Sequence, residues 1–505
     1  MLGKVFGDRG IVGLTVDVPA PATGTSSYRR RPTSNGPKTD PALDSGAVSA
    51  NAVQDDTAAI RSSTRGEAQP RPSRWHTWEF RLYYLVFLTI VPLMVWIPIK
   101  LSLTSNPQYL RFSHHLRPGW LFGRMRDDSD FQYRSFRDYV PALVAIMAVY
   151  VALSKFFSLL PSFGGRTAES GSNGYRPLTA PSSAAQHSPR RNRLLFLHVF
   201  SAVFILALHG ANAAKLVTIL LAQFGLAHVV AGYRWLAPVC LWAFNISALA
   251  AVHWNDGFQW QTIGSSGQLA WLEEYNGLLP RWQINFNITM LRLVSFGLDL
   301  HWAKLAAAST SSPPPPRATF AQQSASLMDG EKARKATDNR LRSSTPRPVS
   351  DYSLAHYLAY TLYPPLFIAG PILSFNDFVD QIYRPPVIPT RTLVRYGLRF
   401  LISLLTMEFI LHFMYVNAIK ETPKAFVGQT PLELSMLGFW NLIVVWLKLL
   451  IPWRFFRLWS LADGVDPPEN MIRCMANNYS TMGFWRSWHR SYNMWIVRWV
   501  TELHR

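Results

Sequence analysis

Apolar residues along the chain gather into long runs separated by polar segments, and this pattern predicts the fold class. A helix needs about 20 mostly apolar residues to cross a hydrocarbon core, and about nine runs approach that length. We therefore predict an all-α fold, a polytopic bundle of transmembrane helices in which re-entrant segments are allowed. The predicted spans cover residues 82–101, 140–160, 194–223, 227–252, 287–308, 352–374, 393–419, 434–452 and 482–500.

Polar stretches divide the chain into a tail, a membrane domain and two loops. Residues 1–74 are rich in Ser, Thr, Pro and Arg with few aromatics, so we predict a disordered tail. Residues 75–505 form the predicted membrane domain. Residues 162–193 and 309–350, which contain Gly-Gly, Ser-Ser and Pro-Pro-Pro-Pro sequences, are predicted to be flexible loops within it.

Basic residues beside the spans predict which side of the membrane each loop faces. They flank the first span and precede the third, so both flanks are predicted to face the cytosol. If every predicted span crosses the membrane, the basic loop 309–350 lies on the side opposite the cytosol. This placement contradicts the rule that basic loops face the cytosol. The conflict indicates that one weak run is re-entrant. Residues 287–308 are our candidate, because they include Arg292, Asp299, His301 and Lys304.

Composition narrows the classes of function. The formal charge of +20 resides in tails and loops, a placement that favours anionic headgroups over nucleic acid as the partner. The two cysteines, Cys240 and Cys474, cannot form a disulfide framework or a cysteine-based metal site. The sequence contains neither a phosphate-binding glycine loop nor a metal-spaced His or Cys cluster. We predict no metal and no resident cofactor.

The most informative stretch lies at residues 485–495. On one continuous helix, aromatic residues would lie on one side of His489 and polar residues on the other. An ionisable group that faces lipid is costly, so these side chains are predicted to face a cavity. The alternative is a helix at the membrane interface, where Trp and Arg are common. The candidate residues beside His489 are Trp485, Arg486, Trp488, Arg490 and Asn493.

His489 is the candidate catalytic residue. A neutral imidazole shielded from water can take a proton from a hydroxyl as that hydroxyl attacks a carbonyl, because burial disfavours the imidazolium. This chemistry fits acyl transfer. No Ser, Asp or Cys partner stands at a readable spacing, so a structural histidine remains the alternative.

Asn285, Arg292 and Asp299 form a second constellation, because they recur every seven residues. On a helix they would lie along one face, about 10 Å apart. We predict that this stripe faces the bundle interior. It would either line a hydrophilic path or form a polar seam that holds helices together.

The third constellation is an interrupted span at residues 363–372, which includes Pro365, Gly370 and Pro371. Such a helix must kink and leave carbonyls without their usual partners. Irregular backbone at membrane depth is tolerated only where it is buried in protein or lines a cavity. The break is predicted to shape a substrate channel, with a purely structural kink as the alternative.

These three stretches occur in the same order in the membrane-bound O-acyltransferase family, and the sequence most resembles its Gup-type branch, which is related to Hedgehog acyltransferase. The resemblance covers residues 75–500. It implies a bundle around a tunnel in which acyl-CoA, as co-substrate, meets an acceptor hydroxyl. His489 matches the first of two polar family positions near the reaction centre, and the other named residues would line the tunnel.

The resemblance also implies a substrate and a location. Gup-type members resemble enzymes that reacylate the lipid of glycosylphosphatidylinositol (GPI) anchors in the endoplasmic reticulum membrane. An older association with glycerol uptake makes the plasma membrane the alternative location. The implied partners are the lipid bilayer, an acyl-CoA donor and a lipid-linked hydroxyl acceptor, and not nucleic acid. The alternative functions are a polyol transporter or transport regulator, a non-catalytic scaffold and a protein acyltransferase.

The end of the chain departs from the family pattern. Members continue after a segment like residues 495–500 into a further apolar helix with a Trp-His pair, whose His is taken as the catalytic base. That pair does not occur after residue 500 in this sequence. We therefore expect the chain to be truncated at its C-terminus and inactive by itself.

Overall fold

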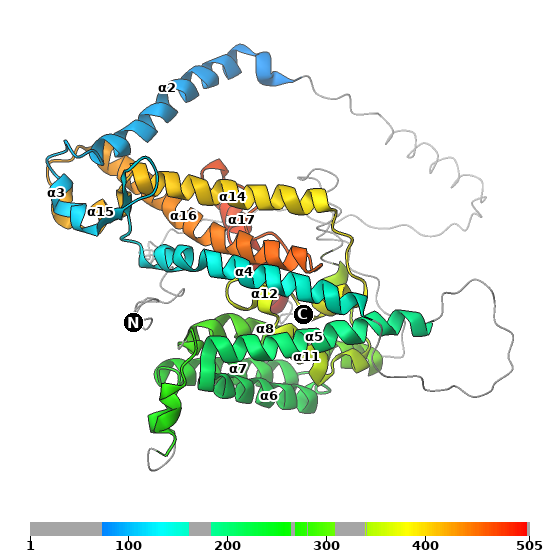
Figure 1. The fold of residues 1–505 in the computed structure, drawn as a ribbon. Helices are drawn as coiled ribbons and strands as arrows, with labels where there is room; N and C mark the ends of the chain where they lie inside the picture. The colour runs from blue at the N-terminus through cyan, green and yellow to red at the C-terminus, as the bar shows by residue number, and fades with distance from the viewer. Residues whose placement is uncertain are drawn as a thin grey trace, which may run out of the picture. The chain divides into compact units, whose positions relative to one another are not determined.

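Long helices make up most of the regular structure in this computed structural model (Figure 1). Within the described part of the chain, the only strands are two short ones that pair as a hairpin, so the all-α prediction is confirmed. The chain divides at residue 97 into two units, and each is described by itself. The structure describes residues 73–160, 183–263, 268–279, 281–308, 339 and 341–501.

The helices differ widely in length. The long helices are α2 (Trp78–Leu101), α4 (Phe131–Leu159), α5 (Ser183–His209), α6 (Ala213–Val230), α7 (Leu236–Trp254), α8 (Trp282–Ala308), α14 (Thr390–Phe413) and α16 (Pro431–Ala462). The shorter α-helices are α3 (Tyr109–Phe112), α11 (Leu354–Thr361), α12 (Pro364–Phe367), α13 (Phe375–Tyr383), α15 (Val416–Lys420), α17 (Thr481–Ser487) and α18 (Arg490–Thr501).

Short 3-10 turns and one hairpin connect these helices. The 3-10 turns are η3 (Arg74–His76), η4 (Ser113–His115), η5 (Gly210–Asn212), η6 (Trp260–Thr262), η7 (Ala270–Glu274), η8 (Val349–Asp351), η9 (Pro423–Phe426) and η10 (Met475–Asn477). The strands β1 (Leu116–Pro118) and β2 (Met125–Asp127) pair antiparallel, with Arg117 opposite Arg126.

Five stretches of helix among the described residues are long and apolar enough to cross a membrane, so the predicted count of nine spans is not confirmed. Only 11% of the most apolar window is buried in each of the Trp78–Leu101 and Phe131–Leu159 stretches, as expected of helices that face lipid. The other stretches are Asn192–Val230, Leu236–Trp254 and Pro431–Ala462.

Helix α8 forms the centre of the larger unit. It packs against α6, α7, α11 and α13, and its buried residues lie all around its circumference. Gly297 allows the close approach of α7, because a Cβ there would lie 2.8 Å from the Leu241 side chain. A helix buried on every side can carry polar residues only where neighbouring elements supply partners.

The topology of α5 to α8 bears on two predictions. The predicted span 194–223 breaks at η5, so α5 and α6 are separate helices. They run in opposite directions: His198 and His228 bond the carbonyls of Ala355 and Tyr352, which lie together at one end. Residues 287–308 belong to one continuous helix of 27 residues, about 40 Å long, which is not among the five apolar stretches, so their re-entrant character stays a prediction.

This extra reversal resolves the conflict over the basic loops. The Lys304 ammonium group bonds the carbonyl of His228, so α8 ends where α6 ends. Trp282 at its start bonds the carbonyl of Gly257, beyond the other end of α7. Asn192 of α5 donates to the carbonyl of Leu160, directly after α4, at 2.9 Å. Helices α4 and α8 therefore end at the same end of the bundle, which we call the basic end.

Helix α16, in the other half of the bundle, also ends at the basic end. Asp463, directly after its last residue, accepts a hydrogen bond from Ser154 at 2.6 Å and pairs with Arg193 at 3.6 Å. Both partners lie near the basic end of α4 and α5. Helix α16 therefore begins at the opposite end, beside α15.

The predicted tail and loops are described only in part. Residues 1–72 of the tail lie outside the described residues. Residues 162–182 and most of 309–350 do so as well. Helix α5 begins at Ser183, inside the range predicted as the first loop. Residues 341–350 of the second loop are described and make contacts considered below.

Candidate functional site

His489 lies in a sharp turn between α17 and α18, so the predicted continuous helix over residues 482–500 is wrong. Its φ is +42°, a left-handed conformation that is uncommon outside glycine. Trp488 before it is extended and ends α17. The carbonyl of His489 accepts hydrogen bonds from the backbone N–H groups of Tyr492 and Asn493, which begins α18. The turn therefore separates helices of 7 and 12 residues.

Contacts from two distant segments hold this turn in place. The Asn470 carbonyl accepts from the N–H of Arg490 at 2.9 Å, and its side-chain oxygen accepts from the N–H of Ser491 at 3.3 Å. The Ser491 hydroxyl in turn accepts from the N–H of Ile372 at 2.9 Å. Ile372 belongs to the interrupted span, so the first and third predicted constellations meet here. Backbone strain of this kind persists only where surrounding contacts impose it.

The imidazole of His489 lies between two aromatic rings. Trp453 on α16 stacks on it with ring centroids 4.7 Å apart, and Tyr492 stacks at 5.4 Å. Among the described residues, no side chain hydrogen-bonds its ring nitrogens. Burial lowers the pKa of His489 to about 4, and the residue lies outside the five candidate spans. The ring is therefore neutral at pH 7, with a nitrogen free to accept a proton.

The interrupted span contains α12, which a buried connection at residues 362–363 joins to α11. The carbonyl of Thr361 has no helical donor, because Pro365 has no N–H, and the guanidinium of Arg292 on α8 donates to it at 2.8 Å. The same guanidinium adds a second donor to the carbonyl of Leu366, which also accepts from the N–H of Gly370 at 3.3 Å. Pro365, Gly370 and Pro371 are all buried. A Cβ on Gly370 would lie 2.5 Å from the Cα of Leu366, so the chain needs glycine there. The break thus leaves the Thr361 carbonyl without its helical donor, as predicted, and Arg292 of the predicted stripe donates to it instead.

Asp299 connects α8 to the helix after His489. Its carboxylate pairs with the Arg498 guanidinium at 2.5 Å and accepts from the Asn376 side chain at 3.0 Å. The Trp495 indole also donates to the carbonyl of Leu291 at 3.0 Å. Asn285, the first member of the stripe, is buried near the start of α8. The charged groups of the stripe are therefore engaged in holding the three constellations together, which favours the polar-seam interpretation.

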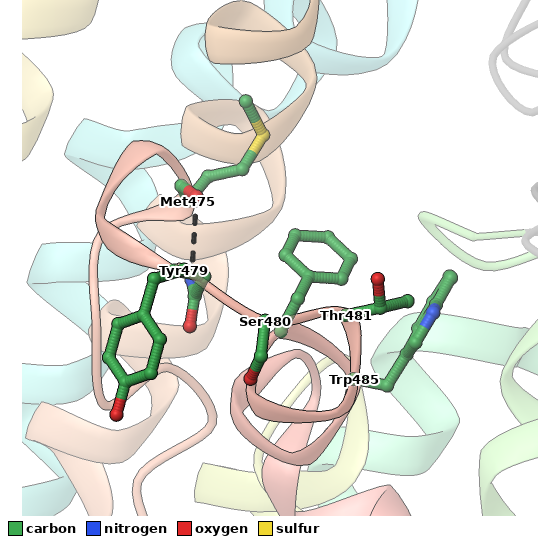
Figure 2. A pocket seen from close by; sticks show the side chains of 7 residues that line it. Met475, Tyr479, Ser480, Thr481 and Trp485 are labelled. Atoms are coloured by element: carbon green, nitrogen blue, oxygen red, sulfur yellow. Dashed lines mark hydrogen bonds between the residues drawn. The ribbon is translucent and has the colours of Figure 1, made fainter.

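An open hollow of about 460 Å³ lies beside α17 (Figure 2). Trp485 lies on one side of it and Tyr479 on the other, with Ser480 and Thr481 between them. Asn478 closes the wall by donating to the Met475 carbonyl at 3.4 Å. Trp485 is therefore the one predicted residue that lines this hollow, because His489 lies one turn further along the chain.

The remaining predicted residues lie around the turn. Trp488 is half-buried and stacks on Phe484 at 5.4 Å. Arg490 and Asn493 are half-buried, and their backbone N–H groups form the turn. Arg486 is exposed on α17. Nothing in these positions tests the substrate-tunnel role, which stays a prediction.

Four residues of the site were missed at the level of sequence. Asn470 and Trp453 lie in segments without a polar pattern near His489, and no periodicity connects them to it. Ser491 lies within residues 485–495, and Arg498 lies just after them. Each is a polar residue in an apolar run, and this is the signal that could have found them. Only the fold shows that Ser491 bonds the interrupted span and that Arg498 pairs with Asp299.

The sequence is similar to those of several known proteins. The profile described as "MBOAT, membrane-bound O-acyltransferase family" matches residues 233–500. The chain is 40% identical over 448 residues to "Membrane-bound O-acyltransferase GUP1" of Saccharomyces cerevisiae, covering 87% of this chain and 72% of that protein. It is 35% identical over 449 residues to "Membrane-bound O-acyltransferase GUP2" of the same yeast, covering 87% and 68%. A mouse "Protein-cysteine N-palmitoyltransferase HHAT-like protein" is 23% identical over 400 residues, covering 77% and 62%.

Proposed function

Because this chain belongs to the membrane-bound O-acyltransferase family, we propose that it transfers a fatty acyl group from acyl-CoA to a lipid-linked hydroxyl. The chain is a multi-pass membrane protein, so both substrates reach it from or beside the bilayer. Acyl-CoA acts as a co-substrate, and no resident cofactor takes part. The acceptor is the lyso form of a GPI-anchor lipid, and the enzyme works in the endoplasmic reticulum membrane.

The observation that carries this proposal is the neutral, stacked imidazole of His489. The acceptor hydroxyl attacks the thioester carbonyl, a bond forms between its oxygen and the acyl carbon, and CoA leaves as the thiol. The base accepts the hydroxyl proton as the bond forms, and the same proton can pass to the leaving sulfur. A ring held between Trp453 and Tyr492 has a fixed orientation, which favours this transfer.

The polyol-transport alternative needs a row of polar groups free to bind a passing solute. Arg292 and Asp299 instead bond the carbonyls of the interrupted span and the Arg498 guanidinium. Their geometry therefore favours a structural seam over a hydrophilic path. A non-catalytic scaffold and a protein acyltransferase are retained as outcomes of the experiment.

The test is an acyl-transfer assay with membranes from cells that express the protein from its own gene. Labelled acyl-CoA and a lyso-GPI acceptor are supplied, and the acylated anchor is quantified. His489→Ala is expected to lower the rate by about 100-fold or more, because a positioned general base contributes at least that factor. His253→Ala is the matched control, since His253 is exposed at the end of α7 opposite the basic end.

The results separate the alternatives. Transfer to a peptide acceptor but not to the lyso-GPI lipid would favour a protein acyltransferase. Absence of transfer to either acceptor by the wild-type protein would favour the scaffold. Equal rates for His489→Ala and wild type would remove His489 from the mechanism.

A further inference from the structure

The segment before α11 is fixed to α13 by ion pairs. We call residues 341–348 the basic strap. Arg342 pairs with Asp377 at 2.6 Å, and Arg347 pairs with Asp380 at 2.9 Å. Both carboxylates belong to α13, the helix that follows the interrupted span. The strap thus lies against the acidic side of α13, and its two arginines hold it there.

A threonine stands between these two arginines in an exposed position. Residues 341–344 form one helical turn, which the N–H of Thr345 extends by bonding the carbonyl of Leu341 at 3.0 Å. Positions three apart on a helical turn are neighbours, so Thr345 lies beside Arg342. The Thr345 hydroxyl donates only to the same Leu341 carbonyl, at 2.7 Å. Pro346 follows it directly.

The charge pattern of the loops predicts that the strap faces the cytosol. The strap lies at the basic end, because residues 349–355 lead directly into the carbonyls that His228 and His198 bond. The described residues at this end include Arg193, Arg234, Arg342 and Arg347, and the sequences that follow α4 and α8 are rich in Lys and Arg. An excess of Lys and Arg in short loops marks the cytosolic side of a membrane protein.

We propose that Thr345 is a phosphorylation site, modified by a proline-directed serine/threonine kinase, and that the phosphate releases the basic strap from α13. A bond forms between the Thr345 hydroxyl oxygen and the γ-phosphorus of ATP. The bond from that phosphorus to the β-phosphate oxygen breaks, ADP leaves, and the hydroxyl proton passes to the kinase base. The product has close to two negative charges beside Arg342 at pH 7.

The added charge competes directly with α13 for the strap. A phosphate binds a nearby guanidinium through charge-assisted hydrogen bonds and repels carboxylates. Arg342 therefore turns from Asp377 to the phosphate. Asp377 is buried, so the loss of this partner leaves its carboxylate with the Gln381 side chain at 2.9 Å. The phosphate on the strap repels the carboxylates of α13, and release of the strap relieves this repulsion.

The strap has a short structural connection to the His489 turn. Asn376, next to Asp377, donates from its backbone and side chain to Asp299 at 3.3 and 3.0 Å. Asp299 pairs with Arg498 on α18. Loosening α13 therefore lowers the acyl-transfer rate, an expectation that rests on the proposed function.

The experiment measures strap release by hydrogen–deuterium exchange of the backbone amides of residues 341–348 in the full-length protein, with residues 421–430 at the opposite end as internal reference. Thr345→Asp imitates the phosphate charge, and Thr345→Asn is the matched control of equal size without charge. Thr345→Asp is expected to speed exchange of the strap amides about fivefold relative to Thr345→Asn, as for loss of a partly exposed ion pair. In an Asp377→Asn background this difference is expected to vanish.

A second measurement tests the modification itself. Purified protein is incubated with ATP and a proline-directed kinase, and the phosphate is located by mass spectrometry. A phosphate on Thr345 that speeds hydrogen–deuterium exchange of the strap amides supports the proposal. Equal exchange rates for the Asp and Asn variants would overturn it, as would an unmodified Thr345. Neither readout requires acyl transfer, so failure here is distinct from failure of the proposed function.

Discussion

At the scale of single residues, His489 combines a strained backbone with a ring held between two aromatic neighbours. Asn470 and Ser491 fix the backbone of the turn, whereas Trp453 and Tyr492 orient the ring. The low pKa follows from the loss of water around the imidazole. A base of low pKa stays unprotonated through the whole physiological range, which gives a testable pH profile.

The rate of acyl transfer should stay constant from neutral pH down to about pH 5 and fall as the pH approaches about 4. The sign follows from the lowered pKa. The neutral, active form of His489 persists until the pH falls to the pKa that this residue has in the folded protein. An ordinary histidine would lose activity near pH 6.5. Initial rates in a buffer series would measure the midpoint, and a midpoint near 6.5 would contradict the assigned environment.

The Asp299–Arg498 pair gives a second prediction at this scale. Asp299→Asn leaves the mostly buried Arg498 guanidinium without a counter-charge, so the protein should lose about 3 kcal/mol of stability. The melting temperature in detergent measures this loss. Asp256→Asn, at an exposed carboxylate, is the control and should change little. An Asp299→Asn, Arg498→Met double variant should recover part of the loss, and absence of any recovery would argue against the pair.

At the scale of elements, one arginine compensates for the interruption of a helix. Pro365, in α12, has no N–H, so the Thr361 carbonyl at the end of α11 lacks its helical donor, and Arg292 bonds this carbonyl together with that of Leu366. The planar guanidinium can reach both carbonyls at once, which a lysine ammonium on a single flexible stem cannot imitate well. The stability of the break therefore depends on a residue 69 positions earlier in the chain.

Arg292→Met should destabilise the protein by about 2 kcal/mol, because the buried Thr361 carbonyl loses its donor and the Leu366 carbonyl keeps only the N–H of Gly370. Arg292→Lys should recover part of that loss through one remaining bond. Arg234→Met, at an exposed arginine, is the matched control. Size-exclusion profiles after heating would rank the variants. A ranking in which Arg292→Met equals Arg234→Met would show that the bridge contributes nothing.

At the scale of the whole molecule, the direction of each helix decides which loops share a side. Helices α5 to α8 alternate, and α16 ends beside the start of α5. Helices α4 and α8 therefore end, and α5 begins, at the same end of the bundle, and cytosolic loops are rich in Lys and Arg. The turn at residues 231–235 lies at this basic end, whereas residues 421–430 lie at the other.

Cysteine labelling should place these two turns on opposite sides of the membrane. In a background with Cys240 and Cys474 replaced by serine, a membrane-impermeant maleimide should label Arg234→Cys from the cytosolic side of sealed vesicles. It should label Lys424→Cys only after the vesicles are opened, although both side chains are exposed. Labelling of both from one side would contradict the alternation of helices.

Much of the fold could be predicted from local pattern, and most of the site could not. The apolar runs gave the class, and the family motifs led to His489, Arg292 and Asp299. The run at 482–500 was apolar enough to predict one helix, but the Asn470 contacts and the left-handed His489 end the first helix at Ser487. The pattern of neighbouring residues contains no information about the hydrogen bond from Arg490 to Asn470, which lies 20 positions away.

The sequence by itself determined that this chain lives in a membrane as a set of helices, because the hydrophobic effect acts on each run wherever its neighbours lie. It also determined the family, since the three constellations recur in order. Only the tertiary structure decided which helices reverse, that Arg292 closes the broken span, and that Asp299 holds Arg498. The physical reason is that a buried polar group must find its partner in space, and the partner of the Ser154 hydroxyl, Asp463, lies 309 residues away along the chain.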